Sequence, residues 1–250
     1  MIWLIRHTER VLSNDENWLN SKRGTENKYD MPITKKGKKY LVKAVEEMIR
    51  EDKDFNKIDY IYSSPLERCI ETSIEIQKNV KKKTKKFLPI KIDYGLRELH
   101  PINYYDHLKL KDGKIKYIVD FKKEIILDKK LSIKNLIKKY GKRIDKNYKS
   151  QTSFHDAKYK SNDQVEGTNF ALNAFKKIIK NDKNNNYILC SHSVSLQYGL
   201  VAYTYKLIPY EIKKHIMGEN NWASLIGINN TKSMKYPFKI TYGPSAKYWK

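Results

Sequence analysis

The chain has 250 residues, of which 40% are hydrophobic and 12% aromatic, and 51 Lys and Arg against 28 Asp and Glu give a formal net charge of +23. This composition excludes a disordered chain, and seven Pro and ten Gly exclude a collagen-like or proline-rich one. No apolar run approaches the length of a membrane span and two Cys build no disulfide framework, so we expect a cytoplasmic protein with one domain over residues 1–250.

The first hundred residues alternate apolar strands with amphipathic helices. Residues 1–5 are apolar but too short for a secretory signal, so we expect a buried strand that begins the fold at once. Thr34 is a helix-capping residue in front of an apolar stripe that predicts a helix over 35–51. The next expected elements are a strand over 58–62, a helix after Pro65, and an edge strand over 88–94.

The middle of the chain, about 100–160, is rich in Lys and Tyr and predicts little beyond a helix over 131–140. We interpret it as a cap-like insertion over the carboxyl-terminal edge of the sheet, within the single domain. The elements expected after it are helices over 165–180 and 194–206 and strands over 186–190, 223–229 and 237–242. The alternation predicts an α/β protein with three α/β/α layers and a mostly parallel central sheet.

The positive charge raises the question of nucleic-acid binding. Only seven of the 51 cationic residues are Arg, the side chain that forks onto bases and phosphates, and the 44 Lys are spread along the chain. We therefore interpret the Lys excess as a solvated surface and expect neither a nucleic-acid nor a membrane partner. The same charge attracts anions, so a phosphorylated ligand is expected.

The motifs of the common hydrolases are absent from the sequence. There is no P-loop, no G-x-G-x-x-G after a strand, no G-x-S-x-G and no H-E-x-x-H. A Cys-based phosphatase needs an Arg six positions after its Cys, but Cys69 and Cys190 have Glu75 and Leu196 there. These absences direct attention to the histidines.

Two of the six His follow apolar strands directly, His7 after residues 1–5 and His192 after 186–190. Ligands of open α/β sheets bind at the carboxyl ends of the strands, so both imidazoles reach one crevice if the two strands are neighbours. The alternative for each is a buried structural His that is tied to a backbone carbonyl.

Charged side chains follow the same strand ends. Arg6 and Arg10 flank His7, and Arg68 follows the second strand. Arg forks bind phosphate in a bidentate manner, although Arg68 alone would suit a surface ion pair with Glu71 or Glu75. Glu98 comes after the third strand and offers a carboxylate at the same edge.

These segments resemble the histidine phosphatase (phosphoglycerate mutase-like) superfamily. Its Arg-His-Gly signature is similar to LIRHTER over residues 4–10, and its Ser-Pro-x-x-Arg-x-x-x-Thr segment to SPLERCIET over 64–72. DMPIT over 30–34, LREL over 96–99 and LCSH over 189–192 match further segments in the same order. Within the superfamily, Arg10, Cys69, TYGPSA over 241–246 and Trp249 resemble the branch of the suppressor-of-T-cell-receptor-signalling (ubiquitin-associated and SH3 domain-containing) phosphatases.

The resemblance implies a metal-independent phosphatase without a cofactor, which forms a phosphohistidine on His7 during phosphomonoester hydrolysis. It implies substrates of the phosphotyrosine-protein or small-phosphoester class, and a homodimer as a possible assembly. Glu98 would be the proton donor and His192 a second catalytic residue. The phosphate-binding residues implied by it are Arg6, Arg10, Arg68, His192 and Ser193.

Two positions depart from the family pattern. Thr8 stands where the signature has Gly, and Ser193 stands where a Gly often follows the second His. Both keep a backbone N–H, but we expect each to add a side chain near the phosphate and to alter the shape of the site.

Three alternatives remain open. A phosphoglycerate mutase would carry an Asn- and Trp-containing run directly after Glu9, which is not found. A non-catalytic phosphate- or nucleic-acid-binding module has no chemical need for two His and three Arg. A divalent-metal hydrolase would use His7, His100, His192 and Glu98, but the arginines beside a dication would be electrostatically unfavourable.

Overall fold

A computed structural model of the chain describes residues 1–11, 16–26, 30–98, 131–153, 164–196, 222–230 and 238–242. Its centre is one six-stranded sheet with the strand order β3-β2-β4-β1-β5-β6. The first four strands of that order run parallel, whereas β5 is antiparallel to β1 and β6 is antiparallel to β5. The strands are β1 (Ile2–Arg6), β2 (Ile58–Ser63), β3 (Ile90–Ile92), β4 (Asn186–Ser191), β5 (Leu225–Asn230) and β6 (Phe238–Tyr242).

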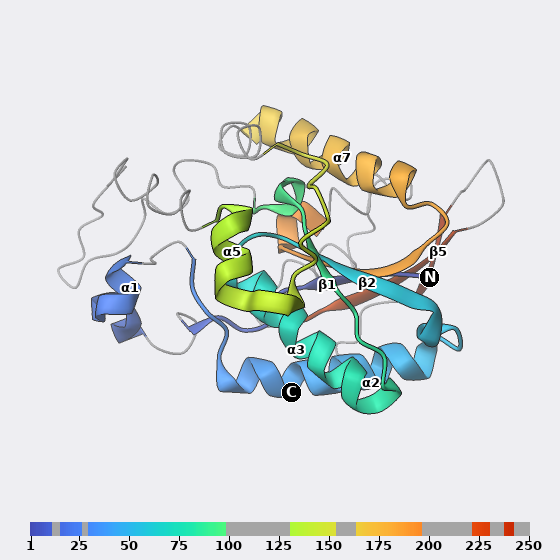
Figure 1. Cartoon of the computed structure of the whole chain (residues 1–250), viewed down its shortest axis with the longest axis horizontal. Coiled ribbons are helices and arrows are strands. Elements are labelled where there is room, and N and C mark those ends of the chain that lie inside the picture. Colours follow the sequence, from blue (N-terminus) through green and yellow to red (C-terminus); the bar gives the residue numbers. More distant parts are fainter. Residues whose placement is uncertain are drawn as a thin grey trace.

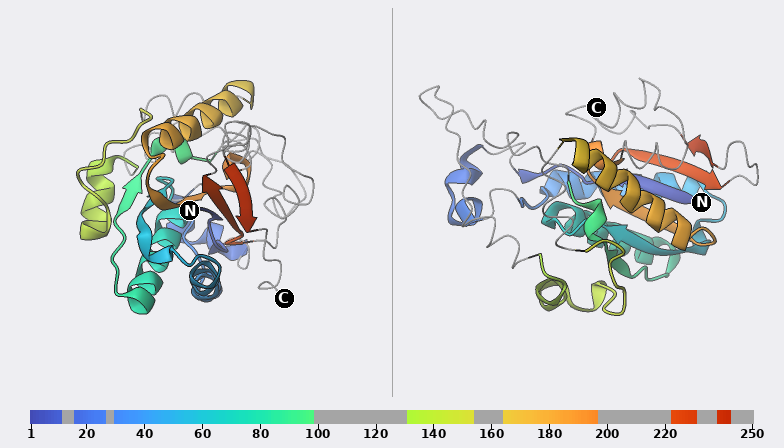
Figure 2. Two further views of the ribbon diagram at one scale, coloured as in Figure 1. Left: turned by 90° about the vertical axis from the view of Figure 1, so that its right-hand side faces the viewer. Right: turned by 90° about the horizontal axis from the view of Figure 1, so that it is seen from above.

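Helices cover both faces of the sheet and form the three expected layers (Figures 1 and 2). On one face lie α2 (Lys35–Glu51) and α3 (Glu67–Thr84), and α7 (Gln164–Asn181) crosses the other. The β-strand pleat sends alternate side chains to the two sides. Trp3 and Ile5 therefore join the core beneath α2 and α3, while Ile2 and Leu4 join Phe175 and Ile178 of α7.

Local sequence explains where α2 begins. The Thr34 side chain accepts a hydrogen bond from the Gly37 amide at 2.8 Å, which satisfies a donor of the first turn. Leu41, Val45 and Met48 then recur at helical spacing and are fully buried. The helix expected over 35–51 is confirmed at both ends.

The described part of the insertion flanks the edge strand β3. Helix α5 (Ile133–Tyr140) joins the core on the α3 side through Leu136. Ile144 then pairs with Ile90 in a parallel bridge, and the Asp145 amide donates to the Ile90 carbonyl at 2.8 Å. The expected cover over the carboxyl-terminal edge falls on residues 99–130 and 154–163, which lie outside the described residues.

The remaining short helices are η2 (Glu16–Asn20), α1 (Lys22–Glu26), η3 (Phe55–Lys57), η4 (Tyr94–Leu96) and η5 (Gly141–Arg143). Of the helix expected over 194–206, residues 193–196 are helical and the rest lies outside the described residues. No helix in the described part of the chain is long and apolar enough to cross a membrane.

Candidate active site

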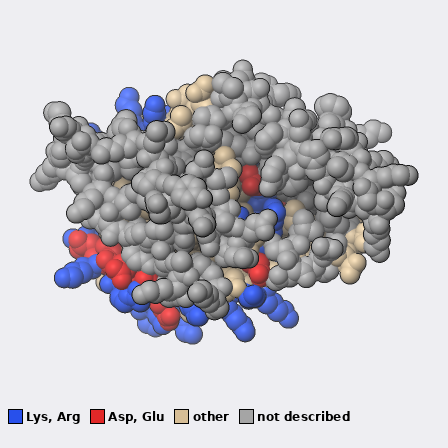
Figure 3. All heavy atoms as spheres, turned by 180° about the vertical axis from the view of Figure 1, so that it is seen from behind, with Lys and Arg blue, Asp and Glu red and all other residues tan. Residues whose placement is uncertain are grey.

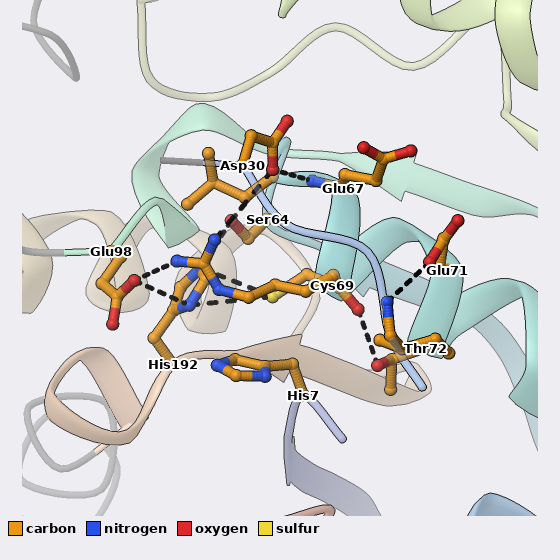
Figure 4. Close-up of polar contacts among 12 residues, drawn as sticks. His7, Asp30, Ser64, Glu67, Cys69, Glu71, Thr72, Glu98 and His192 are labelled. Atoms are coloured by element: carbon orange, nitrogen blue, oxygen red, sulfur yellow. Dashed lines mark hydrogen bonds and ion pairs between the residues drawn. The ribbon is translucent and has the colours of Figure 1, made fainter. Parts of the chain in front are cut away.

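The sheet brings the two strand-end histidines together. Strands β1 and β4 are neighbours with Arg6 opposite Ser191, and the His7 amide donates to the Ser191 carbonyl at 2.9 Å. The ring centroids of His7 and His192 are consequently 5.2 Å apart, and both side chains are buried (Figure 4). The expectation that both imidazoles share one edge of the sheet is confirmed.

One hydrogen bond determines the tautomer of His7. Its Nδ1 lies 2.9 Å from the Thr8 carbonyl oxygen, which only accepts, so Nδ1 carries the proton and Nε2 keeps a lone pair. Burial lowers the pKa of His7 well below its usual value of 6.5, and the nearby charges of Arg68, His192 and Arg6 lower it further. The ring is therefore neutral and able to act as a nucleophile.

Arg68 is fully buried, which contradicts the alternative of a surface ion pair with Glu71 or Glu75. Its guanidinium forms an ion pair with Glu98 and lies 4.0 Å from the Asp30 carboxylate. Figure 4 shows Glu98, His192 and His7 grouped together, with Glu71 well away from them. We call His7, His192, Arg6, Arg68 and Glu98 the histidine cluster.

The Ser-Pro turn after β2 orients His192. Ser64 Oγ lies 2.9 Å from His192 Nε2, and the Ser64 amide donates to the Cys190 carbonyl at 3.1 Å. His192 Nδ1 faces the other way and lies 3.6 Å from Glu98 Oε2. The second imidazole is therefore held between a hydroxyl and the carboxylate of the histidine cluster.

Cys69 lies next to His192 but is not suited to nucleophilic chemistry. Its Sγ is 3.4 Å from His192 Nε2, and the side chain is fully buried. Burial raises the pKa of the Cys69 thiol well above its usual value, so it stays protonated. This agrees with the absence of a Cys-based phosphatase motif.

Thr8 does not add bulk near the phosphate site, contrary to our expectation. Its Oγ1 donates to the Gly37 carbonyl at 2.9 Å, and its side chain is fully buried against the start of α2. A Cβ at Gly37 would lie 2.9 Å from Thr8 Cγ2, so Gly37 makes the space that Thr8 occupies. The backbone amide of Thr8 donates to Thr72 Oγ1 at 3.1 Å.

Ser193 follows His192 directly as the first residue of the helical turn 193–196 and is half-buried. Within the described residues its side chain makes no hydrogen bond. Ser193 therefore lies beside the histidine cluster because it is bonded to His192, and not through a contact of its side chain.

Two residues near the cluster had no role in the sequence-based prediction. Trp222 precedes β5, and its ring centroid lies 5.4 Å from that of His7 and 4.3 Å from Arg6 Cζ. Asp30 accepts a hydrogen bond from the Glu67 amide, and burial raises its pKa to about 7 although Arg68 opposes the shift. The DMPIT segment contained Asp30 but gave it no partner, while a Trp directly before an apolar strand was the available signal for Trp222.

The metal-hydrolase alternative needs several ligands around one cation. Among the residues that the structure describes, no group of three or more His, Cys, Asp or Glu is placed to hold a metal ion. His100, which the metal-hydrolase alternative requires, lies outside them.

The amino-terminal part of the chain, which contains most of the histidine cluster, is similar to a known protein family. Residues 2–111 match the family model of the histidine phosphatase superfamily (branch 1). Over these residues the chain is similar to the histidine phosphatase superfamily. It contains the nucleophile candidate His7 as well as Arg68 and Glu98 of the histidine cluster, whereas His192 joins them through the pairing of β1 with β4. No curated protein matches the sequence.

Solved structures share the fold over nearly the whole chain. The ecdysone phosphate phosphatase of Bombix mori, solved with tungstate, has a TM-score of 0.64 at 18% identity and covers 98% of this chain and 94% of its own. The phosphoserine phosphatase of Entamoeba histolytica, solved with 3-phosphoglyceric acid, has a TM-score of 0.50 at 15% identity, with coverage of 99% and 98%. YhfR of Bacillus stearothermophilus has a TM-score of 0.50 at 16% identity, with coverage of 100% and 98%. These likenesses show the phosphoglycerate mutase-like α/β/α fold that the sequence predicted.

Proposed function

We propose that this histidine phosphatase homologue is a phosphomonoester phosphatase that forms a phosphohistidine on His7. The observation that carries the proposal is the pair of buried imidazoles, 5.2 Å apart, with the guanidinium of Arg68 and the carboxylate of Glu98 beside them. A neutral nucleophile, fixed cations and one carboxylate are the groups that phosphoryl transfer to an imidazole requires.

In the first step, His7 Nε2 attacks phosphorus in line and the bond from phosphorus to the ester oxygen breaks. Arg6, Arg68 and His192 balance the charge on the three equatorial oxygens. Glu98, in its protonated form, gives its proton to the leaving oxygen, so an alcohol departs. Phosphate competes with the Glu98 carboxylate for Arg68, and its negative charge favours protonation of Glu98.

In the second step, a water molecule attacks the phosphohistidine. The Glu98 carboxylate takes a proton from this water, the bond between nitrogen and phosphorus breaks, and inorganic phosphate leaves. Neutral His7 is restored with its Nδ1 proton still bonded to Thr8 O. The arginines supply the positive charge that a metal ion provides elsewhere, so the proposed reaction uses no metal.

For the substrate, we propose a phosphotyrosine protein or a small phosphoester. The structural neighbours are named as phosphatases of ecdysone phosphate and of phosphoserine, two different phosphoesters. Support for the suppressor-of-T-cell-receptor-signalling branch comes from Arg10 and from Cys69 directly after Arg68. Hydrolysis rates for a panel of phosphotyrosine peptides and small phosphoesters would separate the two substrate classes.

The test of the proposed function is hydrolysis of para-nitrophenyl phosphate in the presence of EDTA. We expect His7→Ala to lower kcat by at least about 10³-fold, because the variant lacks the attacking atom. Arg50→Ala, which removes an exposed Arg of α2, is the matched control and should keep wild-type activity. Unchanged turnover by His7→Ala would contradict the proposal, and thermal melting of each variant checks that it is folded.

A further inference from the structure

Three side chains of the β1 end converge on the ring of Trp222. The Cζ atom of Arg6 lies 4.3 Å from the centroid of the Trp222 ring, and the Cζ atom of Arg10 lies 5.8 Å from it. The imidazole of His7 lies against the same ring, with centroids 5.4 Å apart and planes tilted by 37°. Trp222 is 9% exposed, so these contacts take place away from bulk water.

The backbone holds Trp222 at this place. The Arg6 amide donates to the Ser224 carbonyl at 3.1 Å, and the Ala223 amide donates to the His7 carbonyl at 3.3 Å. These two bonds extend the antiparallel pairing of β1 with β5 beyond its last register pair. Ala223 has a φ of +58°, a conformation that non-glycine residues rarely adopt, and this turn leads the chain from Trp222 into β5.

A guanidinium that is held by an aromatic ring differs from one that is held by a carboxylate. Arg68 is held by the carboxylate of Glu98, whose negative charge competes with a bound phosphate. The face of Trp222 attracts a cation through its quadrupole and carries no net charge. Such a ring orients a cation and leaves its positive charge to act on the ligand.

We propose that Trp222 is a positioning residue, an aromatic platform that holds Arg6 and Arg10 in place for the phosphate of the substrate and packs against the His7 ring. This inference rests on the proposed function for its ligand, a phosphate monoester. It assigns Trp222 no contact with the reacting atoms and no proton transfer. Its effect passes through the orientation of the two guanidinium groups.

The test distinguishes the effect of the aromatic face of Trp222 from the effect of its volume. Trp222→Phe keeps a ring face, Trp222→Leu keeps an apolar side chain without one, and Trp18→Leu is the control for loss of a buried Trp elsewhere. The affinity for inorganic phosphate is measured by calorimetry, together with kcat and KM for para-nitrophenyl phosphate and the melting temperature. We expect Trp222→Leu to weaken phosphate binding and to raise KM by about tenfold, with Trp222→Phe within about threefold of wild type.

Several outcomes would overturn the proposal. Equal phosphate affinity of Trp222→Leu and wild type would do so, as would equal losses in the Phe and Leu variants. If Trp222→Leu does not fold, fluorinated tryptophan replaces all four Trp of the wild type, with the labelled Trp222→Phe variant as the reference. Fluorination weakens the quadrupole of the ring at nearly constant shape. A loss of phosphate affinity in the labelled wild type, with none in the labelled Trp222→Phe variant, supports the platform. No loss of affinity in the labelled wild type contradicts it.

Phosphate binding also distinguishes failure of this inference from failure of the proposed function. A wild type that binds phosphate without hydrolysing the ester contradicts the phosphatase, while the variants still test Trp222 by affinity. Normal turnover with unchanged affinity in Trp222→Leu contradicts only the platform. A wild type that does not bind phosphate overturns both.

Discussion

At the scale of single residues, burial controls the charges of the histidine cluster. His7 is kept neutral because desolvation disfavours its protonated form, and the neighbouring Arg68 disfavours it further. Glu98 is 16% exposed and reaches both Arg68 and His192. His7 is thus shielded from protonation. The Glu98 carboxylate lies where an arriving phosphate would compete with it for Arg68.

The ionisation of His7 gives a direct prediction. Because its pKa is lowered in the folded state, the ring stays neutral as the pH falls through 6.5. The stability that this neutral ring contributes is present above pH 6.5 and is lost as the pH falls below it, because only the unfolded chain then binds the proton. In ¹⁵N NMR spectra, with His7→Gln for assignment, we expect no titration of His7 from about pH 8 to about pH 6. A midpoint near 6.5 would show the electrostatic account of His7 to be wrong.

The contact of Glu98 with Arg68 predicts opposite effects on catalysis and binding. Glu98→Gln removes the proton donor of the first step, so kcat/KM, which reports that step, should fall by about 10²- to 10³-fold for an alkyl phosphate and less for para-nitrophenyl phosphate, whose leaving group needs little protonation. The same change removes a negative charge from Arg68, so inorganic phosphate should inhibit more strongly. Glu75→Gln is the control, because Glu75 pairs with Lys78 of α3 and not with a residue of the histidine cluster. Weaker phosphate inhibition in Glu98→Gln would contradict this role of the carboxylate.

At the scale of secondary structure, the site depends on where neighbouring elements end. The parallel strands β1, β2 and β4 place His7, Ser64 and His192 at one edge of the sheet. The first turn of α2 supports this edge, because the Thr8 side chain fills the space beside Gly37. Thr8, which departs from the family signature, is therefore accommodated by the absence of a side chain at Gly37.

This interlock predicts the effect of Gly37→Ala. The new Cβ would lie 2.9 Å from both the Glu9 carbonyl oxygen and Thr8 Cγ2. We expect a loss of about 1–3 kcal/mol in the free energy of unfolding, measured by urea denaturation. Thr8→Gly in the same chain should restore part of it, because one of the two clashes disappears. Lys39→Ala, an exposed change in α2, serves as control, and a Gly37→Ala variant as stable as that control would contradict the interlock.

Patterns within single elements were enough to predict most of the fold. Helical spacing of Leu41, Val45 and Met48 located α2, and the apolar run before Ser191 located β4. The short helices η2 and α1 were not predicted, because elements of five residues are too short to show a periodic pattern.

Local motifs were enough to single out three side chains that the structure places close together. His7 and His192 each come directly after a strand end, and Arg68 lies in the first turn of the helix that follows β2. The contacts of Asp30 with Arg68 and of Trp222 with Arg6 join residues far apart in the chain. They depend on the register of β1 with β5 and on the packing of α3, which no local pattern contains.

At the scale of the whole molecule, the cationic side chains are divided between the exposed surface and the histidine cluster. Lys and Arg crowd the lower border of the molecule, where Asp and Glu lie among them (Figure 3), and α2 and α3 form that part of the fold in Figure 1. Arg6 and Arg68 are instead buried in the histidine cluster. A surface of this sign raises the local concentration of anionic substrates without touching them.

The charge of the molecule predicts a salt-dependent rate. We expect kcat/KM for para-nitrophenyl phosphate to fall several-fold as NaCl rises from about 50 mM to about 500 mM, because salt screens the long-range field. Changing Lys81, Lys82 and Lys83 at the far end of α3 to Glu should flatten this dependence and leave kcat at high salt unchanged. A salt dependence that is the same in both proteins would contradict a contribution from the Lys surface.

Phosphorylation of His7 during turnover is tested most directly by mass spectrometry of the intact protein. Glu98→Gln is mixed with para-nitrophenyl phosphate and quenched in alkali, since this substrate needs no acid and the variant lacks the base for the second step. We predict one added phosphoryl group, which is lost in mild acid and is absent from Glu98→Gln combined with His7→Ala. Release of para-nitrophenolate with no phosphorylated protein, or with the group still present when His7 is replaced, would contradict the account.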